Sequence, residues 1–191
     1  TEWSAQHLGT TRHQELMAAL RVLGIHNHHW LSYRDGHCAS ADPQTAARQI
    51  ARYISQHKPD TILTFGPEGM TGHPDHRAVS EWVTLAANQM PQKPDVYHAV
   101  ITVSQYTNYL QAADQKLNMF YNIDQPPLVE DQDCDICFCC TDELCHCKQQ
   151  AFEAMPSQFQ KMLKTLGREY MSQAFRVEAF VRVTPEKLRN E

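Results

Sequence analysis

The strongest constraint on the fold is a strand-loop-helix unit between residues 59 and 88. The run "TILTF" at 61–65 is short and apolar, as expected of a buried strand. A loop with three glycines follows, and Pro74 then suits the first turn of a helix that we expect to reach about Asn88. A strand that passes through a short loop into a helix is the basic unit of α/β folds.

The same alternation of strands and helices continues on both sides of this unit. Helical spacing or capping residues predict helices at 11–23, 41–58, 74–88, 141–155 and 156–166. Apolar or alternating runs predict strands at 25–33, 61–65, 96–104, 135–140 and 174–183. Residues 105–133, broken by Pro126 and Pro127, are expected to be irregular. This order predicts the α/β class with a mainly parallel sheet, in a single domain spanning residues 1–191.

Composition excludes several classes of protein. The net charge is −5 and there is no run of Lys and Arg, so a nucleic-acid partner is not expected. The longest apolar stretches, such as "HAVITV", are too short to span a bilayer. Seven cysteines, an odd number, argue against a closed disulfide framework and favour a reducing, cytoplasmic compartment. The chain begins at Thr1 rather than Met, which suggests a processed or partial chain.

The candidate site follows the strand at 61–65. Ligands of open α/β sheets bind outside the carboxyl ends of the strands, where residues 66–76 should lie. His73 and His76 flank the start of the helix, so both can point at one crevice. One neutral imidazole is a good zinc ligand, and a second can stabilise an oxyanion or donate a proton. Asp75 could orient a histidine, although the segment could also be only the polar start of a helix.

These residues carry a resemblance to a known family. "PDTILTFGPEGMTGHPDHRAVSEW" resembles the second signature of the zinc-dependent N-acetylglucosaminyl de-N-acetylases, the LmbE-like or PIG-L-like family. "TEWSAQHLGTTRHQELMAALRVLGI", "WLSYRDG" and "CHCKQQAFEAMPSQ" resemble three further segments, so that the resemblance runs from Thr1 to about Val183. It implies a Rossmann-like three-layer sandwich and a metal-dependent amidohydrolase. The implied substrate is a small-molecule amino sugar conjugate of the N-acetylglucosamine type, from which the enzyme removes the acetyl group.

The resemblance also implies roles for single residues. His76 resembles the histidine zinc ligand of this motif, and His73 the histidine that stabilises the oxyanion or protonates the leaving amine. Asp75 resembles the carboxylate that tunes that histidine. Arg12 and Asp35 match positions that contact the sugar or its aglycone.

The sequence departs from the family at two places. Met155 stands where the family has a histidine, although Ser157 and Gln158 match. The family's first signature, a strand ending in His-Pro-Asp-Asp, is absent from these residues, as though the first strand-helix-strand unit were missing. That signature supplies two zinc ligands and the general base, so the chain as it stands is expected to be inactive. We consider a partial chain, a missing segment supplied by a partner or a swapped copy, and a degenerate relative.

Other histidines and cysteines offer alternative metal sites. His26, His28, His29 and His37 could replace the lost ligands, or they could be exposed loop residues. Six of the cysteines lie between 134 and 147, and the thiolates of Cys134, Cys137, Cys145 and Cys147 could hold zinc or an iron-sulfur cluster. They could also pack as small apolar side chains. Two further hypotheses therefore stand beside the enzyme: a non-catalytic α/β module that binds a sugar or protein, and a cysteine-based metal-binding or redox protein.

Overall fold

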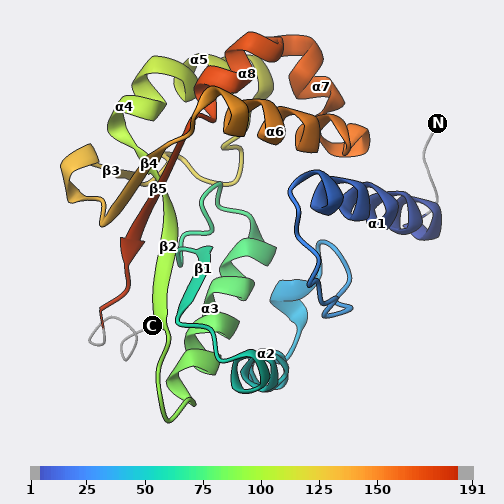
Figure 1. Ribbon diagram of the computed structural model, residues 1–191, viewed down its shortest axis with the longest axis vertical. Helices are drawn as coiled ribbons and strands as arrows, with labels where there is room; N and C mark the ends of the chain where they lie inside the picture. Colours follow the sequence, from blue (N-terminus) through green and yellow to red (C-terminus); the bar gives the residue numbers. More distant parts are fainter. Residues whose placement is uncertain (1–4, 185–191) are drawn as a thin grey trace. The chain divides into compact units, whose positions relative to one another are not determined.

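The computed structural model describes residues 5–184, which form two compact units (Figure 1). Within these residues, the helical unit comprises 5–30, Asn108–Leu117 and Cys139–Val177. The sheet unit comprises Leu31–Thr107, Asn118–Phe138 and 178–184. The single domain expected from the sequence stays a prediction.

The sheet is mixed rather than mainly parallel. Its strands are β1 (Thr61–Phe65), β2 (Asp95–Thr102), β3 (Leu128–Val129), β4 (Ile136–Cys139) and β5 (Val177–Arg182). The order is β1-β2-β5-β4, and β3 pairs with the end of β2. β2 runs parallel to β1 and to β3 but antiparallel to β5. The α/β class is therefore confirmed, the sheet is corrected to mixed, and the Rossmann-like sandwich stays a prediction.

Two helices cover one face of β1 and β2 and supply the core of the sheet unit. They are α2 (Pro43–His57) and α3 (Pro74–Asn88), and α3 runs alongside β1 (Figure 1). The side chains of Val83 and Ala87 on α3 pack against Val96 on β2. Ala47 and Ala51 on α2 pack against α3, where small side chains allow the two helices to approach closely. This packing holds the second half of α3 against β2 and α2.

The segment expected to be irregular contains regular elements. Thr102 ends β2 and caps α4 (Val103–Gln105), since its hydroxyl accepts the Gln105 amide at 3.1 Å. The π-helical turn η2 (Tyr106–Leu110), α5 (Gln111–Leu117) and the 3-10 turn η3 (Asp131–Asp133) follow. The prediction was therefore wrong for 105–117, 128–129 and 131–133, whereas residues 118–127, which include the two prolines, have no regular helix or strand.

The helical unit contains α1 (Ala5–Val22), α6 (Asp142–Glu153), α7 (Pro156–Leu166) and α8 (Arg168–Ala174) together with α5. α1 packs against α6 and α7, and α8 packs against both of these helices. Thr141 caps α6 as predicted, because its hydroxyl accepts the Leu144 amide at 3.4 Å. The sequence analysis did not predict α8. No helix in residues 5–184 has the length and apolar character needed to cross a membrane.

The strand predicted at 25–33 does not form. These residues have no regular structure, and Ile25 and Trp30 are 46% and 47% exposed. A strand needs a neighbour for its backbone hydrogen bonds, and in the described sheet the end strand β1 pairs only with β2. On β1 itself, Leu63 is 56% exposed.

Candidate functional site

His76 is held in one orientation by the loop and strand that precede it. Its ring stacks on Phe65, the last residue of β1, with the ring centres 4.0 Å apart and the planes 3° from parallel. Its Nδ1 lies 3.0 Å from the Gly69 carbonyl oxygen, which can only accept a hydrogen bond. The proton therefore sits on Nδ1, and Nε2 keeps a lone pair for a metal ion or substrate. Burial lowers the pKa of His76 and the adjacent His73 acts in the same direction, which favours the neutral ring.

His73 has the opposite assignment of its ring nitrogens. It is the N-cap of α3, and its Nδ1 accepts the Asp75 amide at 3.1 Å. A nitrogen that accepts carries no proton, so Nε2 is the donor of this ring. The rings of His73 and His76 lie 4.9 Å apart. The pair thus offers a hydrogen-bond donor on His73 beside a lone pair on His76, so that one ring can donate to an acceptor while the other binds a metal ion or accepts a proton.

Two glycines give the loop the shape that orients His76. Gly69 has a φ of +74°, and a Cβ there would lie 3.0 Å from the His73 carbonyl oxygen. Gly72 has a φ of +75°, and a Cβ there would lie 2.8 Å from the backbone oxygen of Asn122. Both positions combine a left-handed backbone with a close backbone neighbour, so only glycine fits without a shift. The prediction that glycines make this loop turn tightly is confirmed.

The Asp75 carboxylate contacts a different segment from the one predicted. It is 8% exposed and accepts the Gly36 amide at 2.6 Å and the Cys38 amide at 2.9 Å. The contact between Asp75 and His73 runs through the backbone amide of Asp75. Tuning of a histidine by this carboxylate therefore stays a prediction, and what the structure shows is an anchor for the turn around Gly36.

The two predicted sugar contacts lie in different units. Asp35 is exposed on the turn that Asp75 anchors, in the sheet unit. Arg12 is half-buried on α1, in the helical unit. Their joint contact with a sugar stays a prediction.

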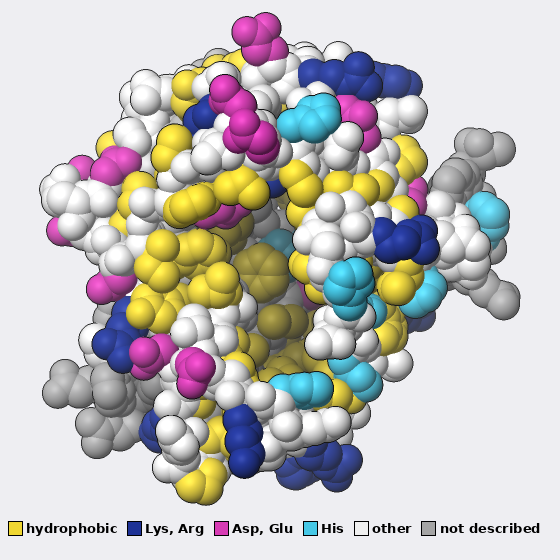
Figure 2. Space-filling view, in the orientation of Figure 1, with side chains coloured by type: hydrophobic (Ala, Val, Ile, Leu, Met, Phe, Trp, Pro, Cys, Tyr) yellow, Lys and Arg dark blue, Asp and Glu magenta, His cyan; other side chains and the backbone are white. Residues whose placement is uncertain are grey.

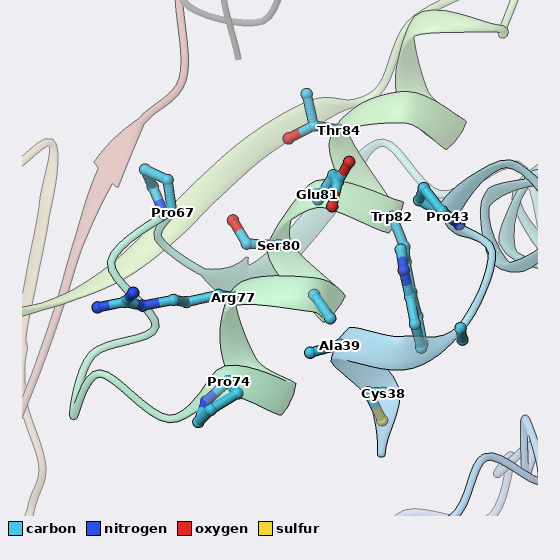
Figure 3. A pocket seen from close by; sticks show the side chains of 12 residues that line it. Cys38, Ala39, Pro43, Pro67, Pro74, Arg77, Ser80, Glu81, Trp82 and Thr84 are labelled. Atoms are coloured by element: carbon cyan, nitrogen blue, oxygen red, sulfur yellow. The ribbon is translucent and has the colours of Figure 1, made fainter. Parts of the chain in front are cut away.

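A cavity of about 560 Å³ lies beside the anchored turn, a volume typical of small-molecule sites (Figure 3). Its walls come from the 3-10 turn η1 (Cys38–Ser40), from α3 and from the loop after β1. Arg77 extends toward that loop, where its Nε donates to the Glu68 carbonyl oxygen at 3.2 Å. Burial and the charge of Asp75 raise the pKa of Cys38, which lines the cavity, to about 11. Sequence reasoning did not identify this cavity.

A buried contact in the helical unit joins two segments that the resemblance treated separately. Glu15, on α1, is 8% exposed, and its carboxylate accepts the Ser157 amide at 2.9 Å and the Ser157 hydroxyl. Ser157 lies in the first turn of α7, whose N-cap residue Met155 provides no side-chain cap. The signal in the sequence was the pair of matched patterns, Arg-x-x-Glu-Leu and Ser-Gln, but nothing in a single sequence links them.

Cysteines and further histidines were the alternative metal ligands. Over residues 5–184, no three His, Cys, Asp or Glu side chains are placed so that they could hold a metal ion. A second metal site at Cys134, Cys137, Cys145 and Cys147 stays a prediction. Cys145 is buried, in agreement with the apolar alternative. His26, His28, His29 and His37 are exposed, and several histidine side chains are visible on the surface in Figure 2.

Comparison with known proteins supports the resemblance. Residues 1–87 match the family model PIG-L: GlcNAc-PI de-N-acetylase. A "Probable N-acetylglucosaminyl-phosphatidylinositol de-N-acetylase" of Schizosaccharomyces pombe is 32% identical over 113 residues, which are 56% of this chain and 46% of the relative. A "1D-myo-inositol 2-acetamido-2-deoxy-alpha-D-glucopyranoside deacetylase" of Mycobacterium sp. is 32% identical over 52% of this chain and 38% of the relative.

The alignment extends further with a third relative. A "Probable N-acetyl-alpha-D-glucosaminyl L-malate deacetylase 2" of Bacillus anthracis is 26% identical over 166 residues, covering 86% of this chain and 63% of the relative. The chain thus spans between about a third and two thirds of the length of these relatives. Its first 87 residues, which include His73, Asp75 and His76, match the PIG-L family model of de-N-acetylases.

Proposed function

We propose that this chain carries part of the active site of a zinc-dependent amidohydrolase that removes the acetyl group from an N-acetylglucosamine-type conjugate. The observation that supports this most directly is the histidine pair after β1, with a lone pair on His76 Nε2 and a donor on His73 Nε2. The relatives are named for the removal of acetyl groups from amino sugar conjugates, and the family match includes both histidines. The predicted cytoplasmic location, and the homo-oligomer or missing-segment partner, remain predictions.

The hydrogen bonding of His76 suits a residue that binds zinc through Nε2. A zinc-bound histidine usually donates its other ring N–H to a carbonyl or carboxylate, and the bond to Gly69 has this form. A catalytic zinc needs about three protein ligands. The other ligands would come from elsewhere in the protein, and the family's His-Pro-Asp-Asp segment is our candidate source. When bound, zinc would polarise the acetamide carbonyl and activate a water molecule.

His73 would supply the donor for the charge that develops on the carbonyl oxygen. Its Nε2–H is set by the bond between Nδ1 and the Asp75 amide, so no reorientation is needed during the reaction. The two ring centres are 4.9 Å apart, close enough for both rings to approach one acetamide group. Losing one such donor typically lowers kcat about 100-fold to 1000-fold.

The test measures amine release from N-acetylglucosamine conjugates of inositol and of malate. The protein is expressed with whatever sequence its gene encodes on either side of residues 1–191. We expect activity that a chelator removes and zinc restores. His76→Ala should lose bound zinc together with activity, whereas His73→Gln should keep zinc and lose kcat.

The matched control is His57→Gln, at the exposed end of α2, which should leave kcat and zinc content unchanged. Activity that resists chelation, or full kcat in His73→Gln, would refute the proposed mechanism. Zinc that stays bound in His76→Ala but is lost when Cys134 or Cys145 is replaced would instead favour the cysteine-based hypothesis.

A further inference from the structure

The Asp75 carboxylate joins two segments that are far apart in the sequence. Its two oxygens accept the amides of Gly36 and Cys38, which lie 39 and 37 positions earlier in the chain. The Asp75 residue is 8% exposed, so its carboxylate has little access to water, although Gly36 itself is exposed. Hydrogen bonds to an ionised carboxylate are shorter and stronger than neutral ones. A buried carboxylate with two backbone donors is therefore a firm anchor for the turn at 35–38.

The same residue is tied to the histidine pair through its backbone. Asp75 lies between His73 and His76 in the first turn of α3, and its amide donates to His73 Nδ1. Its side chain therefore points at the turn while its main chain fixes the donor nitrogen of His73. A displacement of the turn relative to α3 would have to break the bonds to this one carboxylate.

The anchored turn presents an exposed carboxylate of its own. Asp35 precedes Gly36, whose φ of +76° shapes the turn, and the amide of His37 closes it on the Arg34 carbonyl oxygen at 3.0 Å. The charges of Asp75 and Asp35 both act on the Cys38 thiol. Asp35 is exposed and directly precedes Gly36, one of the two residues whose amides the Asp75 carboxylate holds.

We propose that Asp75 is a positioning residue that fixes the turn at 35–38 against the first turn of α3, so that Asp35 reaches the sugar while His73 and His76 face its acetamide group. The part of this inference that concerns the sugar rests on the proposed function. It differs from tuning of a histidine, because Asp75 acts through the turn and determines where the sugar is held. Loss of the carboxylate should therefore weaken substrate binding more than it slows the chemical step.

The first test needs no activity and uses amide hydrogen exchange. In Asp75→Asn, we expect the amides of Gly36 and Cys38 to exchange about 10-fold faster or more, since each loses a charged acceptor. The matched control is Asp131→Asn, because the Asp131 carboxylate also accepts a backbone amide, that of Ser104, at 3.2 Å. The control should speed exchange at Ser104 and leave Gly36 and Cys38 unchanged. Unchanged exchange of both amides in Asp75→Asn overturns the proposal.

A second measurement keeps the anchor testable if Asp75→Asn does not fold. Scalar couplings across hydrogen bonds, measured by NMR in the wild-type protein, should connect the Gly36 and Cys38 amides to the Asp75 carboxyl carbon. Couplings to both amides support the anchor. Their absence at both amides, when other amide-to-carboxylate bonds are detected, overturns it.

The third test uses kinetics to distinguish two roles of Asp75, positioning of the turn and tuning of a histidine. Asp75→Asn should raise KM for the conjugate about 10-fold with a smaller loss of kcat, and Asp35→Asn should do the same. The KM of the double variant should be no higher than that of either single variant, because both substitutions disrupt the same contact between Asp35 and the sugar. A kcat loss at constant KM, or additive effects, overturns the positioning role. If the wild type releases no amine at all, the proposed function fails together with the substrate part of this inference, and hydrogen exchange still decides the anchor.

Discussion

The contact between Glu15 and Ser157 predicts a specific loss of stability in the helical unit. Glu15→Gln keeps the size of the side chain but removes the charge that accepts the Ser157 amide at 2.9 Å and the Ser157 hydroxyl. A net hydrogen bond to a charged group contributes about 1.5 to 3 kcal/mol, and the substituted amide can still accept one bond. Since the site is 8% exposed, water cannot replace the lost acceptor fully. We expect the free energy of unfolding to fall by about 2 kcal/mol.

The contribution of the pair itself can be isolated by a double-mutant cycle. Ser157→Ala removes the hydroxyl and keeps the backbone amide, so it should cost about 1 kcal/mol. The variant with both substitutions should be less destabilised than the sum, with a coupling energy of about 1 kcal/mol. The measurement is urea denaturation of the four proteins, followed by far-ultraviolet circular dichroism.

A surface carboxylate in the same unit serves as the control. Glu153 accepts from the Arg168 Nε at 2.7 Å, but the Arg168 side chain is 73% exposed. Exposed ion pairs contribute about 0 to 1 kcal/mol, so Glu153→Gln should change stability by less than Glu15→Gln. Strict additivity of Glu15→Gln and Ser157→Ala would refute the contact between the Glu15 carboxylate and the Ser157 hydroxyl, and an equal loss in Glu153→Gln would refute the larger contribution expected of the buried carboxylate.

Three further predictions concern the sheet unit. Gly72→Ala should destabilise the protein by more than Gly24→Ala as measured by urea denaturation, because both have a left-handed φ but only at Gly72 would the added methyl group meet a backbone atom, at 2.8 Å. Trp82→Ala should cost about 3 to 5 kcal/mol, since the indole is 1% exposed, and an unchanged denaturation midpoint would contradict this. The pKa of Cys38 is raised to about 11, so its alkylation, followed by peptide mass spectrometry, should keep accelerating from pH 8 to pH 11 and stay slower than that of the exposed Cys137. A Cys38 rate that levels off near pH 9 would contradict it.

The helix starts of the sheet unit could be predicted because their signals are local. Asp42 before Pro43 predicted the start of α2, and the Asp42 carboxylate does accept the Thr45 amide at 2.9 Å. Pro74 likewise marked the start of α3, and the apolar run before the loop became β1 with the predicted bounds. Each of these signals involves residues a few positions apart, whose geometry is the same in any surrounding structure.

Predictions that depended on distant partners were less reliable. Residues 25–33 were predicted to form a strand, but strand formation depends on a neighbouring backbone that the local sequence does not reveal. The mainly parallel sheet was predicted wrongly for the same reason. β5 runs antiparallel to β2, and no local residue distinguishes a parallel from an antiparallel pairing.

The site shows the same division between local and distant information. The positions of His73 and His76 followed from the motif, and their ring nitrogens are set by the Asp75 amide and the Gly69 carbonyl, which lie within seven residues. The Gly36 amide, which donates to the Asp75 carboxylate, lies 39 residues away, whereas a carboxylate beside two histidines suggested that a neighbouring histidine was the donor. The partner of Glu15 is 142 residues away and had no local signal at all.

The stacked ring of His76 has a consequence for the entropy of ligand binding. Phe65 blocks one face of the imidazole and the Gly69 carbonyl oxygen holds one edge, so rotation about its side-chain bonds is already restricted before anything binds. Binding of a ligand to Nε2 would therefore cost little side-chain conformational entropy, whereas an exposed histidine loses its rotamer freedom when it binds a ligand. Replacing Phe65 with a smaller side chain would release the ring and transfer that entropic cost to the binding event, without removing a single atom that touches the ligand.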